Sequence, residues 1–185
     1  MAEAYPTPLA GQRITASLLR SMQPQVARKT ADTQRAATTT AVADPHLTFE
    51  VEANAAYVWD GWLKYDGATG GDLIVDFTAP TGALGEWGAH GAGIVVIGAD
   101  DSPLVLQTDT VQSTGYMVRL ETNDVMQFRT YGTLGTGNAL TLLISGTLRT
   151  ASTGGTFSLD WAQGTSNATN TTLFTDSWLK MQRVA

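Results

Sequence analysis

Apolar and polar residues alternate along most of the chain from Leu47 onward. In the segment 47–52, Leu47, Phe49 and Val51 take every second position, and polar residues take the positions between them. An alternation of period two puts the apolar side chains on one face, which predicts a half-buried β-strand. Further strand-like segments lie at residues 57–65, 73–78, 93–98, 104–109, 116–122, 125–130, 139–149, 156–162 and 177–184.

Together these segments predict about ten short strands with no helical pattern between them. Such an arrangement favours an all-β sandwich or barrel over a fold in which strands and helices alternate. The last segment carries Trp178, Leu179, Met181 and Val184 almost to the end of the chain at Ala185. We expect it to be a structural strand, because large apolar side chains are unfavourable in a solvated tail.

The first 44 residues follow a different pattern. Two prolines indicate an extended leader, and apolar residues then recur at helical spacing until Pro24. This spacing predicts a short helix over about residues 15–22, with Thr15 as its N-cap. A helix of two turns is unstable alone, so its apolar stripe must be covered by the body or by another subunit. The stripe consists of Ile14, Leu18, Leu19 and Met22.

Residues 27–44 are rich in Thr, Ala and Arg and show no apolar periodicity, which predicts an extended linker. We therefore divide the chain into an N-terminal anchoring arm, residues 1–44, and a β-sandwich body, residues 45–185. The chain has a net charge of −6, to which the arm contributes +2 and the body −8. Arg13 precedes the apolar stripe and Arg20 lies within it, so we expect the arm to bind an acidic protein surface. The alternative is that the arm is a flexible, solvated leader.

Several classes of partner are disfavoured by composition. The acidic body and the dispersed basic residues do not form the clustered positive patch of a nucleic-acid-binding protein. No apolar run approaches the roughly 20 residues of a membrane-spanning helix. The absence of cysteine excludes disulfides and thiolate metal sites. We expect neither a nucleic-acid partner nor a membrane partner.

Residue types that support catalysis or metal binding are sparse. His46 and His90 are the only histidines, and neither lies in a pattern that places a second ligand beside it. Asp100, Asp101 and Asp109 lack the spacing and the central glycine of a calcium-binding loop, which favours an acidic turn. No Gly-x-Ser-x-Gly motif is present. We therefore expect no metal site, no cofactor and no enzyme activity.

Two alternatives involve glycans. Asp60, Asp76, Asp160 and Glu86 are candidate carboxylates for a glycoside hydrolase, but any chain with 17 acidic residues offers such pairs. Trp87 lies in an expected loop, which makes it the best candidate for an exposed sugar-stacking residue. The tryptophans that alternate with polar residues favour a place in the core.

The segment 8–22, PLAGQRITASLLRSM, resembles the short helical motif found near the N-terminus of many structural proteins of tailed phages. Five more segments resemble small structural proteins of phages that infect actinobacteria. They are VARKT at 26–30, DPHL at 44–47, YVWDGW at 57–62, FTAPTG at 77–82 and WAQGTSNAT at 161–169. This resemblance implies a jelly-roll β-sandwich similar to tumour necrosis factor-like domains, which commonly form trimers.

The resemblance implies a non-enzymatic virion protein, assembled in the cytoplasm of the host bacterium. We expect a capsid decoration protein or a short head fibre that forms a homotrimer through its body. Its arm then binds the major capsid protein or another virion protein. A minor tail protein is an alternative within this class. Two further alternatives are an adhesin that binds a host cell-surface glycan through Trp87 and a glycan-cleaving enzyme.

Overall fold

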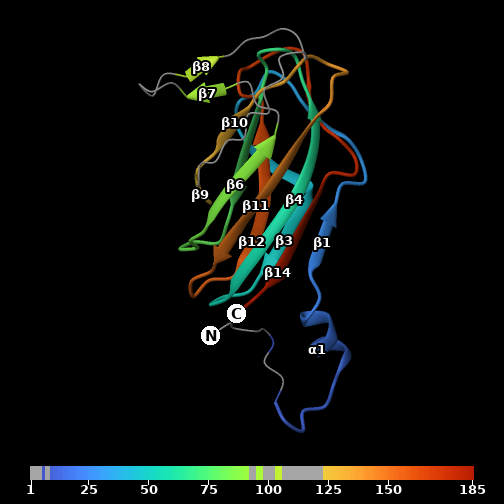
Figure 1. Cartoon of the computed structure of the whole chain (residues 1–185), viewed down its shortest axis with the longest axis vertical. Coiled ribbons are helices and arrows are strands. Elements are labelled where there is room, and N and C mark those ends of the chain that lie inside the picture. The colour runs from blue at the N-terminus through green and yellow to red at the C-terminus, as the bar shows by residue number, and fades with distance from the viewer. Residues whose placement is uncertain (1–5, 7–8, 92–94, 98–102, 106–122) are drawn as a thin grey trace.

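The computed structural model describes residue 6 and residues 9–91, 95–97, 103–105 and 123–185. In these residues the protein is a β-sandwich with one short helix near the N-terminus (Figure 1). The elements are α1 (Ala16–Ser21), β1 (Gln25–Arg28), β2 (Thr33–Arg35), β3 (Val42–Val51), β4 (Ala56–Asp66), β5 (Leu73–Thr78), β6 (Glu86–Gly91), β7 (Val95–Ile97), β8 (Pro103–Val105), β9 (Asn123–Asp124), β10 (Arg129–Tyr131), β11 (Leu140–Arg149), β12 (Gly155–Ala162), β13 (Thr171–Leu173) and β14 (Trp178–Arg183).

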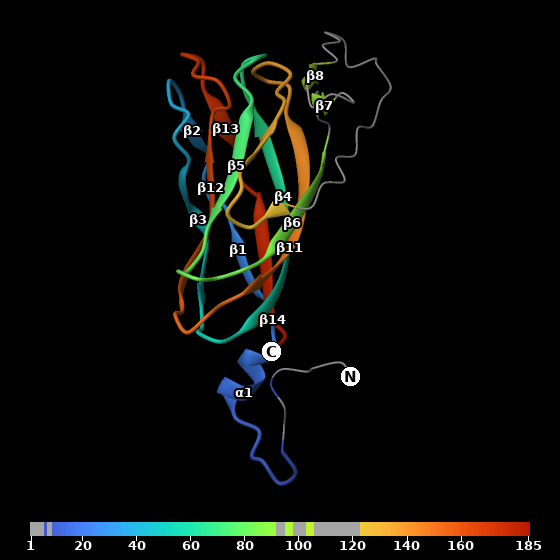
Figure 2. The ribbon, with the colours of Figure 1, turned by 90° about the vertical axis from the view of Figure 1, so that its left-hand side faces the viewer.

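Two antiparallel sheets form the sandwich (Figure 2). The larger sheet has the strand order β1-β14-β4-β11-β6-β9, and β13 joins it by pairing with β4 and with β2. The smaller sheet has the order β10-β5-β12-β3. Successive strands from β3 to β6 alternate between the sheets, so strands adjacent in space are distant in sequence. This is the arrangement of a jelly roll, and it confirms the predicted fold.

Side chains from both sheets meet in a core with an aromatic centre. Phe77 of β5 lies at this centre, with ring centroids 4.8 Å from Trp59, 5.1 Å from Trp87 and 5.4 Å from Phe157. All four side chains are at most 5% exposed. The alternation that predicted the strands therefore also predicts which face of β3 and β4 is buried, whereas in β5 three consecutive residues, 73–75, are buried.

Gly61 allows β14 to lie close to β4. A Cβ atom at this position would lie 2.7 Å from the backbone carbonyl oxygen of Trp178 and would also overlap the side chain of Leu179. No side chain fits at that distance from a backbone atom. The glycine therefore interrupts the apolar face of β4 at the point where the last strand of the chain docks.

The last strand is as expected, because β14 pairs with both β4 and β1. Ala185 is tied to β4, since its carbonyl oxygen accepts a hydrogen bond of 3.0 Å from the amide of Ala56. Leu179 and Met181 are 1% exposed, whereas Trp178 is partly exposed on the outer side of the sheet. Of the four apolar residues of this segment, two therefore belong to the core.

Other strand predictions are met only in part. The segments 93–98 and 104–109 correspond to β7 and β8 where they are described, and 116–122 lies outside the described residues. In the segment 125–130 only the end is a strand, β10. The short strands β1, β2, β9 and β13, and the strand β6, were not predicted.

The predicted boundary between arm and body at residue 44 is wrong. β1 pairs with β14, and β2 pairs with β13, so the expected linker contributes two strands to the larger sheet. A strand at the edge of a sheet is held by backbone hydrogen bonds and needs no apolar alternation, which is why the pattern did not reveal it. The body therefore begins at Gln25, and in the described residues the arm is limited to residue 6 and residues 9–24.

Candidate functional site

Trp87 is a core residue, and its prediction as an exposed sugar-stacking residue is wrong. Its side chain is 1% exposed, and its Nε1–H donates a hydrogen bond of 3.2 Å to the carbonyl oxygen of Gln127. The residue lies in β6, where Trp87 and Ala89 are buried and Glu86 and His90 are exposed. Glycines at positions 85, 88 and 91 surround these residues in the sequence and concealed the alternation.

The outer face of the larger sheet gathers apolar side chains in solvent. Val26, Val58 and Leu143 are 65%, 43% and 49% exposed, and Trp62 and Trp178 are partly exposed. Trp62 lies directly opposite Trp178 on one side and Leu143 on the other. The full row across the sheet is Arg28, Trp178, Trp62, Leu143 and His90.

A charged pair lies within this outer face. Lys180 Nζ and Asp60 Oδ1 are 2.9 Å apart, and both side chains are more than 40% exposed. A solvent-exposed ion pair contributes only about 0–1 kcal/mol to stability. Lys180 and Asp60 can therefore separate to contact another protein, because breaking their ion pair costs little folding free energy.

The outer face of the smaller sheet is polar by contrast. Thr156 Oγ1 donates to Glu50 Oε1 at 2.9 Å, and Thr78 Oγ1 donates to Asp160 Oδ2 at 2.7 Å. Ser158 Oγ also donates to Asp160 at 2.6 Å. The two outer faces thus differ in chemistry: the larger sheet presents tryptophan and aliphatic groups beside the Lys180–Asp60 pair, and the smaller sheet presents hydrogen-bonded polar groups.

Asp76 lies directly opposite Asp160 on the smaller sheet. Burial raises the pKa of Asp76 above its ordinary value of 3.8; a hydrogen bond from the Phe77 amide opposes this rise, and the nearby charge of Asp160 adds to it. A raised pKa in the folded state means that the ionised carboxylate destabilises the fold near pH 7. This unfavourable contribution disappears as pH falls below 3.8, where the group is protonated in both states.

Asp76→Asn is therefore expected to raise the free energy of unfolding at pH 7, because the amide removes the charge and retains an oxygen that can accept from Phe77. The advantage over the wild type should shrink as pH falls through the pKa of Asp76 towards 3.8. Urea titrations at a series of pH values measure this difference. An advantage that stays constant with pH would show that its origin is packing and not charge.

The candidate carboxylates do not converge on one site. Asp76 and Asp160 lie on the smaller sheet, whereas Asp60 and Glu86 lie on the larger sheet. In the described ranges no group of three His, Cys, Asp or Glu side chains is arranged to hold a metal ion. The acidic candidates at positions 100, 101 and 109 lie outside the described residues.

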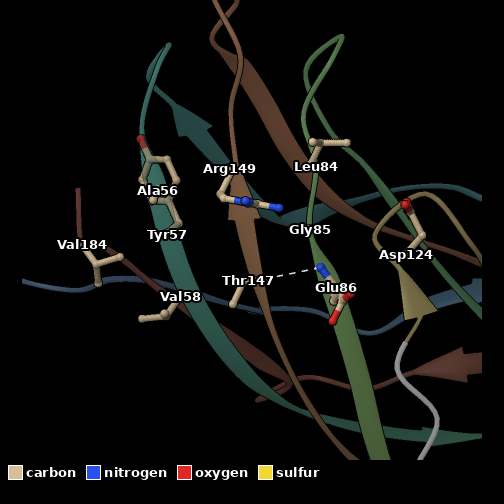
Figure 3. Close-up of a pocket in the computed structure, with 10 residues that line it drawn as sticks. All are labelled: Ala56, Tyr57, Val58, Leu84, Gly85, Glu86, Asp124, Thr147, Arg149 and Val184. Carbon is tan, nitrogen blue, oxygen red and sulfur yellow. Dashed lines mark hydrogen bonds between the residues drawn. The ribbon is translucent and has the colours of Figure 1, made fainter. Parts of the chain in front are cut away.

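A pocket of about 520 Å³ lies near one end of the larger sheet (Figure 3). Val58 and Leu84 supply apolar surface, and Glu86, Asp124 and Arg149 supply charge. The Glu86 amide donates a long hydrogen bond of 3.4 Å to Thr147 Oγ1. The pocket opens where β4 begins and β11 ends, so it extends the outer face of the larger sheet.

The arm projects beyond the same end of the sandwich that holds the C-terminus (Figures 1 and 2). Its helix begins as predicted, because Thr15 Oγ1 accepts a hydrogen bond of 3.2 Å from the Leu18 amide. Ile14, Leu19 and Met22 are 71%, 52% and 46% exposed. Leu18 is partly buried and Arg13 is exposed, while Arg20 is described only by its helical backbone.

A buried charged cluster was missed at the sequence level. Lys29 and Asp44 are fully buried, and Lys29 Nζ donates to Asp44 Oδ2 at 2.6 Å and to Thr33 Oγ1 at 2.8 Å. Trp161 Nε1–H donates to the same Asp44 oxygen at 3.2 Å. The Arg35 guanidinium lies over the Trp161 ring, 4.1 Å from its centroid. No local pattern marked it, because its members come from separate segments.

No protein-family profile matches the sequence, and neither a curated protein nor a solved structure matches it. Among the described residues, no helix is long and apolar enough to cross a membrane. Three features of the described residues bear on function: the exposed arm, the outer face of the larger sheet and the buried cluster.

Proposed function

We propose that this protein is a non-enzymatic structural component of a tailed-phage particle, either a capsid decoration protein or a short head fibre. The observation that carries the proposal is the exposed apolar stripe on an arm that projects from one end of a jelly roll. Such an arm suits attachment, while the sandwich provides a rigid body. The resemblance of segment 8–22 to helical motifs of phage structural proteins supports the same function.

The arm attaches the protein to the major capsid protein or to another virion protein. Ile14, Leu19 and Met22 enter an apolar groove of that partner, and Arg13 contacts acidic groups at the rim. Burial of these side chains offsets the conformational entropy lost when the arm becomes ordered. A minor tail protein attached in the same way is the alternative location in the particle.

The body forms a homotrimer through the outer face of the larger sheet. The contrast between the two outer faces supports this assignment, since Val58, Leu143 and the two partly exposed tryptophans lie on one side only. Tryptophan is enriched at protein interfaces, where one residue removes a large area from water. Three arms on one trimer then bind the particle with much higher avidity than a single arm.

Two chains, the full chain and one lacking residues 1–24, test the proposed roles of the body and the arm. Light scattering measures whether each chain is a trimer, and co-sedimentation measures whether it binds particles. The truncation ends before β1, so it leaves both sheets intact. We expect a trimer in both cases, and we expect only the full chain to bind particles assembled without the protein. A monomer in both cases contradicts the trimer, and particle binding by the truncated chain contradicts the role of the arm.

Leu19→Asp is expected to reduce binding to such particles by at least about tenfold, because a charge enters an apolar groove that the wild-type side chain fills. Its melting temperature should equal that of the wild type, since Leu19 is 52% exposed. Co-sedimentation with particles and thermal unfolding measure the two effects. Normal particle occupancy by this variant would show that the stripe is not the attachment site.

Leu143→Glu is expected to convert the trimer to a monomer, because it places a charge at the centre of the proposed subunit interface. Thr48→Glu is the matched control, since Thr48 is exposed on the outer face of the smaller sheet. Light scattering should give a trimer for the control and a monomer for Leu143→Glu. A trimer for both variants would exclude the outer face of the larger sheet as the interface.

A carbohydrate-binding adhesin is the second candidate function, and the tryptophan pair of the outer face favours it. Trp62 and Trp178 face each other across β4 and β14, and both are partly exposed. Adjacent aromatic rings on a sheet are suited to stacking against sugar rings. Binding of purified host cell-wall polysaccharide that is lost in Trp62→Ala, without change in oligomeric state, would favour this function over the trimer.

A further inference from the structure

We propose that Lys29 and Asp44 form an amide bond between their side chains, which makes the buried cluster a site of autocatalytic cross-linking. This inference is independent of the proposed function, because it depends only on the geometry of the core. Its product is a covalent link between the start of the larger sheet and β3 of the smaller sheet. Burial, proximity and the groups around the Asp44 carboxyl all favour this reaction.

Both reacting groups are removed from water. The side chains of Lys29 and Asp44 are 0% exposed, and Lys29 Nζ lies 2.6 Å from Asp44 Oδ2. Burial of an ammonium and a carboxylate is unfavourable even when they are paired, and transfer of one proton makes both neutral. The neutral amine is a nucleophile, and it is held beside the carboxyl carbon that it attacks.

The backbone fixes the lysine in this position. The Lys29 amide donates to the carbonyl oxygen of Ser177 at 2.8 Å, and the Asp176 amide donates to the carbonyl oxygen of Lys29 at 3.1 Å. Thr33 Oγ1 accepts from Nζ at 2.8 Å and restricts the amine further. These contacts reduce the motion that the amine must lose before reaction, which is the main contribution of proximity to rate.

Hydrogen-bond donors surround the Asp44 carboxyl on both oxygens. Trp161 Nε1–H donates to Oδ2 at 3.2 Å, and the His46 amide donates to Oδ1 at 2.9 Å. Donors in these positions withdraw electron density from the carboxyl carbon and stabilise the negative charge that develops on oxygen after attack. The site therefore contains an electrophile that is polarised before the reaction begins.

His46 supplies a group for proton transfer. Its Nδ1 lies 3.7 Å from Asp44 Oδ1, and within the described part of the chain this buried atom has no hydrogen-bond partner. An imidazole beside a leaving oxygen can accept a proton from the attacking nitrogen and donate it to that oxygen. The Nδ1 atom of His46 is therefore placed to transfer a proton during the reaction.

The reaction is balanced without an external reagent. A proton passes from the Lys29 ammonium to the Asp44 carboxylate, and the amine lone pair then forms a bond from Nζ to Cγ. After attack, a second proton passes from the nitrogen, through the His46 imidazole, to the same carboxyl oxygen. The bond from Cγ to that oxygen breaks, and the oxygen leaves with both transferred protons as water. The product is a secondary amide with one N–H, and neither oxidation nor reduction occurs.

The mass of the full-length protein under denaturing conditions tests this inference directly. We expect a mass lower than that of the sequence by one water molecule. After trypsin digestion, we expect a branched peptide that joins residues 29–35 to residues 36–64. A mass equal to that of the uncross-linked chain would overturn the proposal and leave the cluster as a buried ion pair.

Three variants establish the position and the chemistry of the link. Lys29→Arg keeps the positive charge and should remove the mass deficit. The control Lys180→Arg changes the exposed pair with Asp60, and its mass deficit should equal that of the wild type. Asp44→Asn releases ammonia in place of water, so its cross-linked product should have the same mass as the cross-linked wild type. A deficit that persists in Lys29→Arg, or a branched peptide at other positions, would also overturn the proposal.

Discussion

Asp44→Ala is expected to lower the free energy of unfolding by about 3–5 kcal/mol, because it removes the group to which Lys29 is paired or, after the proposed reaction, bonded, and leaves a buried ammonium without a partner. Before the proposed reaction the carboxylate accepts hydrogen bonds from Lys29, Trp161 and the His46 amide. Alanine removes all of these acceptors, and Lys29 is 0% exposed in the folded protein. Urea denaturation monitored by tryptophan fluorescence measures the loss.

The matched control is Asp60→Ala, which removes the carboxylate of the exposed pair with Lys180. We expect a loss of only about 0–1 kcal/mol, because Lys180 remains solvated after its partner is removed. Each variant removes an aspartate side chain from a lysine, and the two lysines differ in burial. Equal losses in the two variants would show that water reaches Lys29, so that the cluster is not desolvated.

The sequence pattern was most informative where one face of a strand is buried by the other sheet. In β3 the positions of Leu47, Phe49 and Val51 determine the buried face, because successive side chains point to opposite sides of a strand. The same reasoning placed the final strand correctly. It wrongly favoured burial of Trp178, which is partly exposed on the outer side of the sheet, since that segment does not alternate strictly.

Edge strands and buried polar groups were not predictable in this way. β1 and β2 are held by backbone hydrogen bonds to β14 and β13, and backbone groups are the same for every sequence. Lys29 and Asp44 lie in a stretch without apolar periodicity, and a polar residue in such a stretch is normally assigned to solvent. Only the fold, which brings β3 beneath the segment after β1, places the two side chains together.

Trp87→Ala is expected to lower the free energy of unfolding by about 3–5 kcal/mol, because truncating a large buried aromatic side chain leaves a cavity. Trp87 is 1% exposed and packs edge-on against Phe77, with ring centroids 5.1 Å apart. The loss should not depend on protein concentration, since the ring is buried within one subunit. Thermal and urea unfolding at several protein concentrations measure it.

Trp62→Ala is the matched control, since the same residue type is partly exposed on the outer face of the larger sheet. A side chain buried only between subunits stabilises the folded state by mass action, so its contribution grows with protein concentration. We therefore expect a loss of stability that increases with concentration for Trp62→Ala and a constant loss for Trp87→Ala. A constant and equally large loss in both variants would mean that Trp62 is covered by its own chain, which would remove it from the proposed interface.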